Sequence, residues 1–313
     1  MTTSAAGPHG VLVVDKPSGP TSHDVVDQVR RALATRRAGH TGTLDPFATG
    51  VLAVCVGKAT RLARFLSGGV KEYRATVRLG FATTTDDATG APVGGSRPVG
   101  VGEGAVRAAC AGLVGDLLQV PPAYSAKRVA GRRLYEMARQ GVAVDRRASP
   151  VTIYALDLRG FVEDLVELDV RCSPGTYIRA LARDLGESLG VGGHLMALRR
   201  TRTGPFDLER AVSWADLSGG GDPSGRLVPL SDLLPDLPAV RVGAEGIGVL
   251  RHGRDLGRAQ VQGGFPEGSP PERVRVLGDD GALLALAVPK GFGLAVPGLK
   301  LEPALHPDVV LLD

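Results

Sequence analysis

Cysteine, lysine and aromatic residues are scarce in this chain. Its three cysteines, Cys55, Cys110 and Cys172, lie far apart and match neither a disulfide framework nor a CxxC metal pair. Two of them stand in apolar, strand-like runs, so we expect small buried thiols in a reducing cytoplasm. These absences exclude a disulfide-stapled scaffold and a cysteine-based zinc site.

Segments that would cross or enter a membrane are also missing. The longest wholly apolar run covers residues 282–288, far short of a span, and residues 1–10 have neither a basic stretch nor an apolar core. We therefore expect a cytoplasmic protein with no membrane partner.

Motifs for metals and nucleotides are absent in the same way. Five histidines show no ligand spacing, so we expect no metal: His9, His23, His194, His252 and His306. The stretch from Gly50 to Lys58 superficially suggests a Walker A loop. It fails because six residues separate its glycines and because Lys58 is followed by alanine.

The chain is long enough for one large domain and a small one. It has 313 residues, of which 43% are hydrophobic, with a net charge of +4 and a pI near 9.1. Such a composition excludes global disorder, but a mildly basic balance does not by itself indicate a nucleic-acid partner. We predict a first domain over residues 1–238 and a β-rich second domain over residues 239–313.

A glycine-rich loop over residues 39–50 is the most informative stretch. It holds Asp45, the only acid between Asp27 and Glu72, and an apolar run over residues 51–56 follows at once. Glycines and a proline at this density predict a loop, and the apolar run predicts a buried strand. A rigid loop at the mouth of a strand is a good place for one reactive carboxylate. The alternative is that Asp45 only caps a turn before Pro46.

Periodicity predicts the elements around this loop. Thr21 and Asp24 are spaced as a capping box for a helix that begins near Ser22. Residues 71–79 alternate, which places Tyr73 on the apolar face of a strand. We also expect strands at 10–14, 151–158, 164–172 and 195–202, and helices at 105–118 and 178–189.

Positive charge is concentrated in residues 119–150. This segment has seven Lys/Arg against two acids, a net +5, so the rest of the chain is about neutral. Tyr124 and Tyr135 interleave with the cations, which is typical of a polyanion contact. A solvated helix face is the alternative interpretation, and the residues alone do not decide between them.

Arg179 stands in the first turn of the expected helix, away from its buried stripe. A cation is unfavourable at a helix N-terminus because it opposes the helix dipole. This conflict predicts that Arg179 has a specific anionic partner.

Several stretches, taken together, resemble the TruB-type tRNA pseudouridine-55 synthases. They run in order over residues 10–206: 10–22, 39–50, 71–74, 122–127, 175–179 and 198–204. The resemblance implies an α+β fold, with a mixed, largely antiparallel central sheet flanked by helices. Residues 239–313 resemble the PUA-like module at the C-terminus of that family. They hold eight Lys/Arg against nine acids.

The resemblance also implies an activity and the residues that perform it. The family isomerises uridine-55 in the T-loop of tRNA to pseudouridine without a metal or cofactor. Asp45 would act on a flipped-out uridine, either as nucleophile or as general base, and Arg179 would pair with it and keep it ionised. We expect a monomer whose partner is the T-arm of tRNA.

The remaining roles also come from the resemblance. Tyr73 would stack on the uracil and relay a proton, while Tyr177 and Leu198 would complete the pocket wall. His40 would help to extrude the uridine. The expected phosphate contacts are Lys16, Lys127, Arg128, Arg132 and Arg133.

Three other functions remain open from the sequence. A non-catalytic RNA-binding or chaperone protein would explain the basic segment but not the Asp45 loop with its Arg179 partner. A glycosidase or nucleosidase usually needs two cooperating carboxylates, and no second acid is apparent in the loops linked to Asp45. The same isomerisation on a different RNA is the third possibility.

Overall fold

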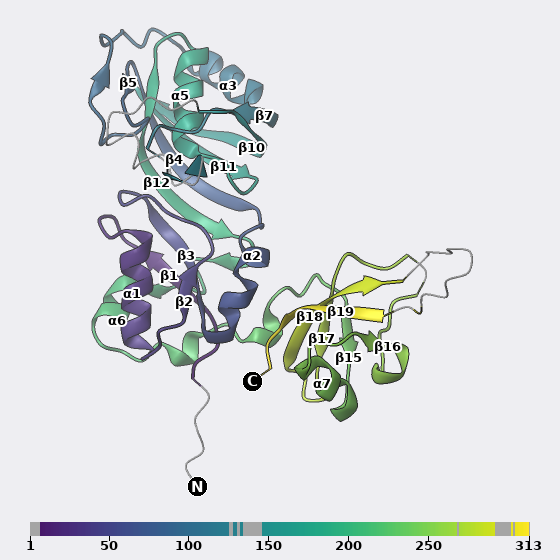
Figure 1. Ribbon diagram of the computed structural model, residues 1–313. Coiled ribbons are helices and arrows are strands. Elements are labelled where there is room, and N and C mark those ends of the chain that lie inside the picture. The colour runs from purple at the N-terminus through teal and green to yellow at the C-terminus, as the bar shows by residue number, and fades with distance from the viewer. Residues whose placement is uncertain are drawn as a thin grey trace.

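The computed structural model describes residues 7–124, 146–267, 269–291, 302 and 304–312, and the backbone of 128–129 and 132–133. Its elements form a large mixed sheet with helices beside it and a second, five-stranded sheet (Figure 1). The fold is therefore α+β, as the sequence predicted. No helix among the described residues is long and apolar enough to cross a membrane.

Among the described residues, the large sheet has ten strands, and most of its pairings are antiparallel. Eight strands follow one path, in the order β14-β1-β3-β12-β4-β11-β10-β7. Two short strands join beside it, β2 (Ala38–His40) on β3 and β13 (Phe206–Asp207) on β12. The strands of the path are β14 (Val212–Ser213), β1 (Gly10–Lys16), β3 (Thr49–Val56), β12 (Gly193–Thr203), β4 (Lys71–Leu79), β11 (Leu165–Cys172), β10 (Ser149–Val162) and β7 (Gly115–Gln119).

Helices cover one face of this sheet because every second strand residue on that face is apolar and each helix turns an apolar stripe toward it. In β4 the buried residues are every second one, and they include Tyr73. One apolar cluster joins these strand residues to the helices on that face. The helices are α1 (Ser22–Ala32), α3 (Glu103–Gly112), α5 (Ile178–Ser188) and α6 (Trp214–Ser218). Helix α1 begins with the predicted capping box of Thr21 and Asp24.

The five-stranded sheet has the order β15-β17-β18-β19-β16, with helix α7 (Ala244–Arg251) beside it. Its strands are β15 (Ala239–Arg241), β16 (Leu256–Gly257), β17 (Val274–Leu277), β18 (Leu283–Lys290) and β19 (Ala304–Val310). One cluster is its own core. A second cluster joins Leu283, Leu286 and Leu311 to Val11 and Val51 of the large sheet. The two sheets therefore share apolar contacts, and a domain boundary at residue 238 stays a proposal.

The interface between the two sheets also contains charged side chains. Helix α2 (Ala63–Leu66) presents Arg64, whose guanidinium lies 2.6 Å from a carboxylate oxygen of Asp308. Arg273 donates to the same carboxylate at 3.2 Å. Both guanidinium groups also lie over the ring of Phe65, 4.6 and 5.2 Å from its centroid.

One predicted element is wrong. Residues 105–118 do not form a single helix: α3 ends at Gly112 and residues 115–119 form strand β7, the edge strand beside β10. Gly115, the first residue of β7, has φ of 108°, a conformation that an L-residue rarely adopts and that is not helical. The apolar residues of 115–118 match helical spacing only by chance. The segment is a strand because it pairs with β10, a long-range contact that local periodicity does not reveal.

All three cysteines are buried, as expected. Cys55 lies in β3, Cys110 in α3 and Cys172 in β11, and each is a free thiol. Burial raises their pKa values, to about 12 for Cys55 and about 11 for Cys110 and Cys172.

Candidate active site

The Asp45 loop connects β2 to β3 and is held by groups from outside the loop. The Ser22 hydroxyl, at the start of α1, donates to the Leu44 carbonyl at 2.9 Å and accepts from the Leu44 amide at 2.8 Å. The Gly19 amide donates to the Pro46 carbonyl at 2.8 Å. These bonds fix the backbone on both sides of Asp45, so its carboxylate is presented by a rigid support.

Lys16 also belongs to this support, and not to a phosphate site. Its ammonium is completely buried and donates to the carbonyls of Pro17, Pro46 and Ala48, at 2.9, 3.1 and 2.7 Å. An ammonium has three N–H groups, so none remains for RNA. Burial lowers the pKa of Lys16 to about 8, despite the opposing attraction of Asp45. The predicted phosphate contact of Lys16 is therefore wrong. A lysine in a turn-rich stretch looks exposed in the sequence when two of its three acceptors, Pro46 and Ala48, lie thirty or more residues away.

Arg200, in β12, holds the other end of the loop. It is buried and donates to the carbonyls of Val51, Gly42 and Thr43, at 2.7, 3.0 and 3.4 Å. The strand passes so close that a Cβ on Gly50 would lie 2.1 Å from the Arg200 carbonyl oxygen, and Gly50 has φ of 99°. Glycine is therefore required where the loop enters β3.

Arg179 joins two carboxylates. Its Nε lies 2.9 Å from Asp45 Oδ2, and its Nη1 lies 3.3 Å from Asp87 Oδ2. The Arg179 side chain is only 5% exposed and that of Asp87 6%, whereas the Asp45 side chain is 34% exposed. The anionic partner predicted for Arg179 is thus present, and Asp45 is the carboxylate of the pair that solvent and ligands can reach.

Opposing influences act on the Asp45 carboxyl. Loss of water around it raises its pKa, and the charge of Asp87 acts in the same direction. Arg179 opposes this through its charge and its hydrogen bond, and Lys16 adds a weaker attraction. Burial outweighs the cations, so the pKa of Asp45 lies above its usual value. The sequence had suggested only the lowering influence of Arg179.

Asp87 is held by its own turn, which sequence reasoning did not connect to Asp45. Its Oδ1 accepts from the hydroxyls of Thr85 and Thr89, at 2.7 and 2.6 Å, and from the Thr89 amide at 3.0 Å. The turn lies between the short strands β5 (Ala82–Thr83) and β6 (Pro92–Val93). Three hydrogen bonds and Arg179 occupy this carboxylate, so it orients Arg179 and does not line the cavity.

A cavity of about 340 Å³ opens beside Asp45. Its lining residues come from the Asp45 loop, from β4 and β12, and from the turn that leads into α5. They are Thr41, Gly42, Thr43, Leu44, Asp45, Ser67, Lys71, Tyr73, Pro174, Gly175, Thr176, Tyr177, Ile178, Arg179, Leu198 and Arg200. A volume of this size suits one nucleoside better than a folded RNA surface.

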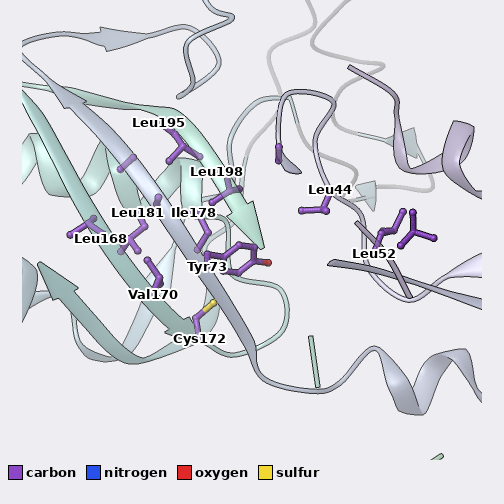
Figure 2. Close-up of a cluster of buried hydrophobic side chains, with 14 of the residues drawn as sticks. Leu44, Leu52, Tyr73, Leu168, Val170, Cys172, Ile178, Leu181, Leu195 and Leu198 are labelled. Carbon is purple, nitrogen blue, oxygen red and sulfur yellow. The ribbon is translucent and has the colours of Figure 1, made fainter. Parts of the chain in front are cut away.

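Four of the predicted pocket residues line this cavity with Asp45: Tyr73, Tyr177, Arg179 and Leu198. Figure 2 shows the Tyr73 ring beside Leu198, with its hydroxyl pointing toward the loop that carries Leu44. Tyr73 is 7% exposed, and burial raises its pKa while the nearby charge of Arg200 opposes the rise. The hydroxyl therefore carries its proton at neutral pH.

His40 lies at the end of β2, one residue before the loop, and does not line the cavity. Its Nδ1 is buried without a hydrogen-bond partner among the described residues. Burial and the charge of Arg200 lower its pKa, which favours the neutral imidazole.

The root of the basic segment is fastened to α5. The Gln119 side chain accepts from the Tyr177 amide at 2.8 Å and donates to the Tyr177 carbonyl at 3.1 Å. Arg179 donates to the Tyr124 carbonyl at 2.8 Å, and Arg183 donates to the Val120 carbonyl at 3.1 Å. The predicted RNA-contacting segment therefore starts directly at the active site.

The cations of that segment are described only in part. Lys127 lies outside the described residues. Arg128 belongs to strand β8 (Arg128–Val129), and Arg132 and Arg133 form β9 (Arg132–Arg133), which pairs with β8. Their phosphate contacts stay predictions. In the described part of the chain, no cluster of His, Cys, Asp and Glu could hold a metal ion.

Comparison with known proteins places the chain in a family. Residues 30–178 match the TruB family pseudouridylate synthase N-terminal domain, and residues 179–220 match the tRNA pseudouridylate synthase B C-terminal domain. A tRNA pseudouridine synthase B from Arthrobacter sp. (strain FB24) is 44% identical over 303 residues, covering 94% of this chain and 97% of that protein. The chain belongs to the TruB family of pseudouridylate synthases.

Other relatives agree with this TruB assignment. The tRNA pseudouridine synthase B of Aromatoleum aromaticum is 47% identical over 249 residues, which cover 79% of this chain and 80% of that protein. Among solved structures, a chain of a Cbf5-Nop10-Gar1 complex superimposes with a TM-score of 0.71 at 27% identity, covering 100% of this chain and 91% of that one. This TruB-family member therefore has the pseudouridine-synthase fold.

Proposed function

We propose that this TruB-family protein isomerises uridine-55 in the T-loop of tRNA to pseudouridine, with Asp45 as the catalytic carboxylate. The observation that carries the proposal is the Asp45–Arg179 ion pair, which is buried on the arginine side and open on the carboxylate side to a cavity of nucleoside size. Among the described residues, no other carboxylate lines that cavity.

Asp45 acts at the junction of sugar and base. Arg179 holds both of its oxygens, with Nε 2.9 Å from Oδ2 and Nη2 3.2 Å from Oδ1, which fixes the orientation of the carboxylate and favours its ionised form. An ionised carboxylate at C1′ can attack that carbon or remove a sugar proton, and either route releases the base. The rejoining of the base through C5 needs no change of oxidation state, so the isomerisation requires no cofactor.

The cavity wall receives the uracil. Tyr73 supplies an aromatic face on which the flipped base stacks, a contact worth roughly 1–3 kcal/mol. Tyr177 and Leu198 close the sides, and the Tyr73 hydroxyl would relay the C5 proton by passing on its own proton as it accepts that one. His40 lies before the loop, outside the cavity, where it assists the extrusion of the uridine from its stack.

The RNA partner is the T-arm, which a single copy of the chain binds in the cytoplasm. The basic segment supplies the phosphate contacts through Lys127, Arg128, Arg132 and Arg133. Support comes from its root, because Tyr124 shares the Arg179 guanidinium with Asp45. Lys16 is not among these contacts.

A glycosidase or nucleosidase fits the geometry less well. A second carboxylate, Asp87, is near Asp45, but Arg179 lies between them and Asp87 does not line the cavity. Two-carboxylate hydrolysis needs both groups on the reacting bond.

Mapping pseudouridine in tRNA transcripts tests the proposal. The purified protein is incubated with a full tRNA transcript and, as a matched control, with the same transcript carrying cytidine at position 55. We expect one pseudouridine, at position 55, in the first transcript and none in the second. Absence of product, or product only at another position, would contradict the proposed function.

A further inference from the structure

Two buried lysines lie close to the active site, and their surroundings differ. Lys16 is 0% exposed and its three N–H groups meet three carbonyl oxygens. Lys71 is 8% exposed and donates to one carbonyl, that of Ser67, at 3.2 Å. An ammonium has three donors, so Lys16 is satisfied by the protein while Lys71 has capacity for a ligand.

No anion of the described chain compensates Lys71. Many arginines of the described chain form ion pairs with Asp or Glu, but Lys71 forms none. The charged group that acts on it most is the Arg200 guanidinium, which has the same sign and, together with burial, lowers its pKa. Cys172, the other titratable neighbour, is a protonated thiol. A buried cation without a compensating anion destabilises the fold, so an acceptor on a ligand would lower the free-energy cost of burying Lys71.

The position of Lys71 points to the base of the nucleotide. Lys71 and Tyr73 lie on the same face of β4, two residues apart, which corresponds to about 6.8 Å along a strand. Both line the cavity that Asp45 enters. In the proposed complex the sugar carbon lies at Asp45 and the uracil ring stacks on Tyr73. The four-carbon side chain of Lys71, beside Tyr73, can then reach a carbonyl group of the uracil.

We propose that Lys71 is a catalytic residue whose ammonium donates a hydrogen bond to a carbonyl oxygen of the uracil ring, O2 or O4, and stabilises the ring while it is detached. This inference rests on the proposed function. When the N1–C1′ bond breaks, its electron pair stays with the ring, and the negative charge spreads over N1, O2 and O4. Lys71 keeps its proton throughout. The C5–C1′ bond then forms, the proton leaves C5 and N1 gains one, so the atoms balance as an isomerisation.

Three variants test this role: Lys71→Met, Lys71→Arg and, as a matched control, Lys16→Met. For each we would measure the single-turnover rate of pseudouridine formation in full tRNA, tRNA affinity at several salt concentrations, and the melting temperature. Lys71→Met should slow the chemical step about 10²-fold or more, as the loss of one donor to a developing anion does. Affinity and its salt dependence should stay close to wild type, because phosphates dominate RNA binding.

Stability separates a catalytic lysine from a structural one. Lys71→Met removes an uncompensated buried charge, so its melting temperature should equal or exceed that of the wild type. Lys16→Met leaves three carbonyls without donors, so its melting temperature should fall. Lys71→Arg keeps a positive donor and should recover part of the rate lost in Lys71→Met.

Each contrary result has a distinct meaning. A wild-type rate in Lys71→Met overturns the proposal, and so does a fall in melting temperature comparable with Lys16→Met. A flatter salt dependence of binding in Lys71→Met would assign the lysine to a backbone phosphate and would also overturn it. Failure of the wild-type protein to form pseudouridine would instead refute the proposed function.

Discussion

The two sheets differ in what they bury. Around the ten-stranded sheet, the core contains charged side chains: Lys16, Lys71, Asp86, Asp87, Arg179 and Arg200. In the described part of the five-stranded sheet and its helix, no polar or charged side chain is buried. Buried charge costs free energy that apolar packing does not. The core of the ten-stranded sheet therefore carries a free-energy cost for the sake of the active site, whereas the core of the five-stranded sheet serves folding alone.

The largest effect should come from Asp45→Asn. Loss of the carboxylate should lower the single-turnover rate by ~10⁴-fold or more, the scale on which loss of a catalytic side chain is felt. Because the pKa of Asp45 is raised in the fold, its charged form opposes folding at neutral pH, and the asparagine variant should melt at the same temperature or higher. A rate near wild type would remove Asp45 from the mechanism, and a large fall in stability would make it a structural residue.

Replacement of Arg179 should have the next largest effect. Arg179→Lys should slow turnover about 10²-fold, because a point charge cannot hold both Asp45 and Asp87 as the planar guanidinium does. Arg179→Ala should also move the acidic limb of the rate–pH profile to higher pH, because the lowering influence on the pKa of Asp45 is lost. Full activity in the lysine variant, with an unshifted acidic limb in Arg179→Ala, would contradict this role.

Two leucines of the five-stranded sheet test whether the two sheets unfold together. Leu286 packs in the cluster shared with the large sheet, and Leu256 packs in the separate cluster, both fully buried. Each change to alanine should cost about 2–5 kcal/mol without changing the rate per folded molecule. Calorimetry should show one transition lowered by both variants if the sheets unfold together. A second transition that only Leu256→Ala lowers would instead show independent units.

The smallest effect should be on RNA binding. Replacing Lys127, Arg128, Arg132 and Arg133 by glutamine should weaken tRNA binding and reduce its salt slope by about 0.7–0.9 for each phosphate that the variant no longer neutralises. The five-stranded region has nearly equal numbers of cations and acids, so Lys290→Gln serves as the matched control and should leave the slope unchanged. An unchanged salt slope in the fourfold variant would show that these four cations are an ordinary solvated surface and do not contact RNA phosphates.

Local patterns predicted what depends on neighbours in the chain. The alternation of residues 71–79 identified β4 at its observed bounds, and the unfavourable place of Arg179 in its helix indicated an anionic partner. The lone Asp45 in a glycine-rich loop was identifiable because no other acid is near it in sequence.

Long-range contacts were not predictable in the same way. Asp87 reaches Arg179 from a turn more than ninety residues away, and Arg200 binds the loop from β12. The only available signal for Arg200 was a cation in the middle of a strand pattern. Lys16 was misassigned for the same reason, because two of its three acceptors, the carbonyls of Pro46 and Ala48, come from the Asp45 loop.

The buried cysteines have a practical consequence for following the motions of this enzyme. With pKa values of about 11 to 12, the three thiols hold almost no thiolate at neutral pH, and alkylating reagents should not react with them in the closed protein. Each sits in a different element, β3, α3 and β11. The labelling rate of each thiol would therefore report how often its own element opens, without any engineered probe.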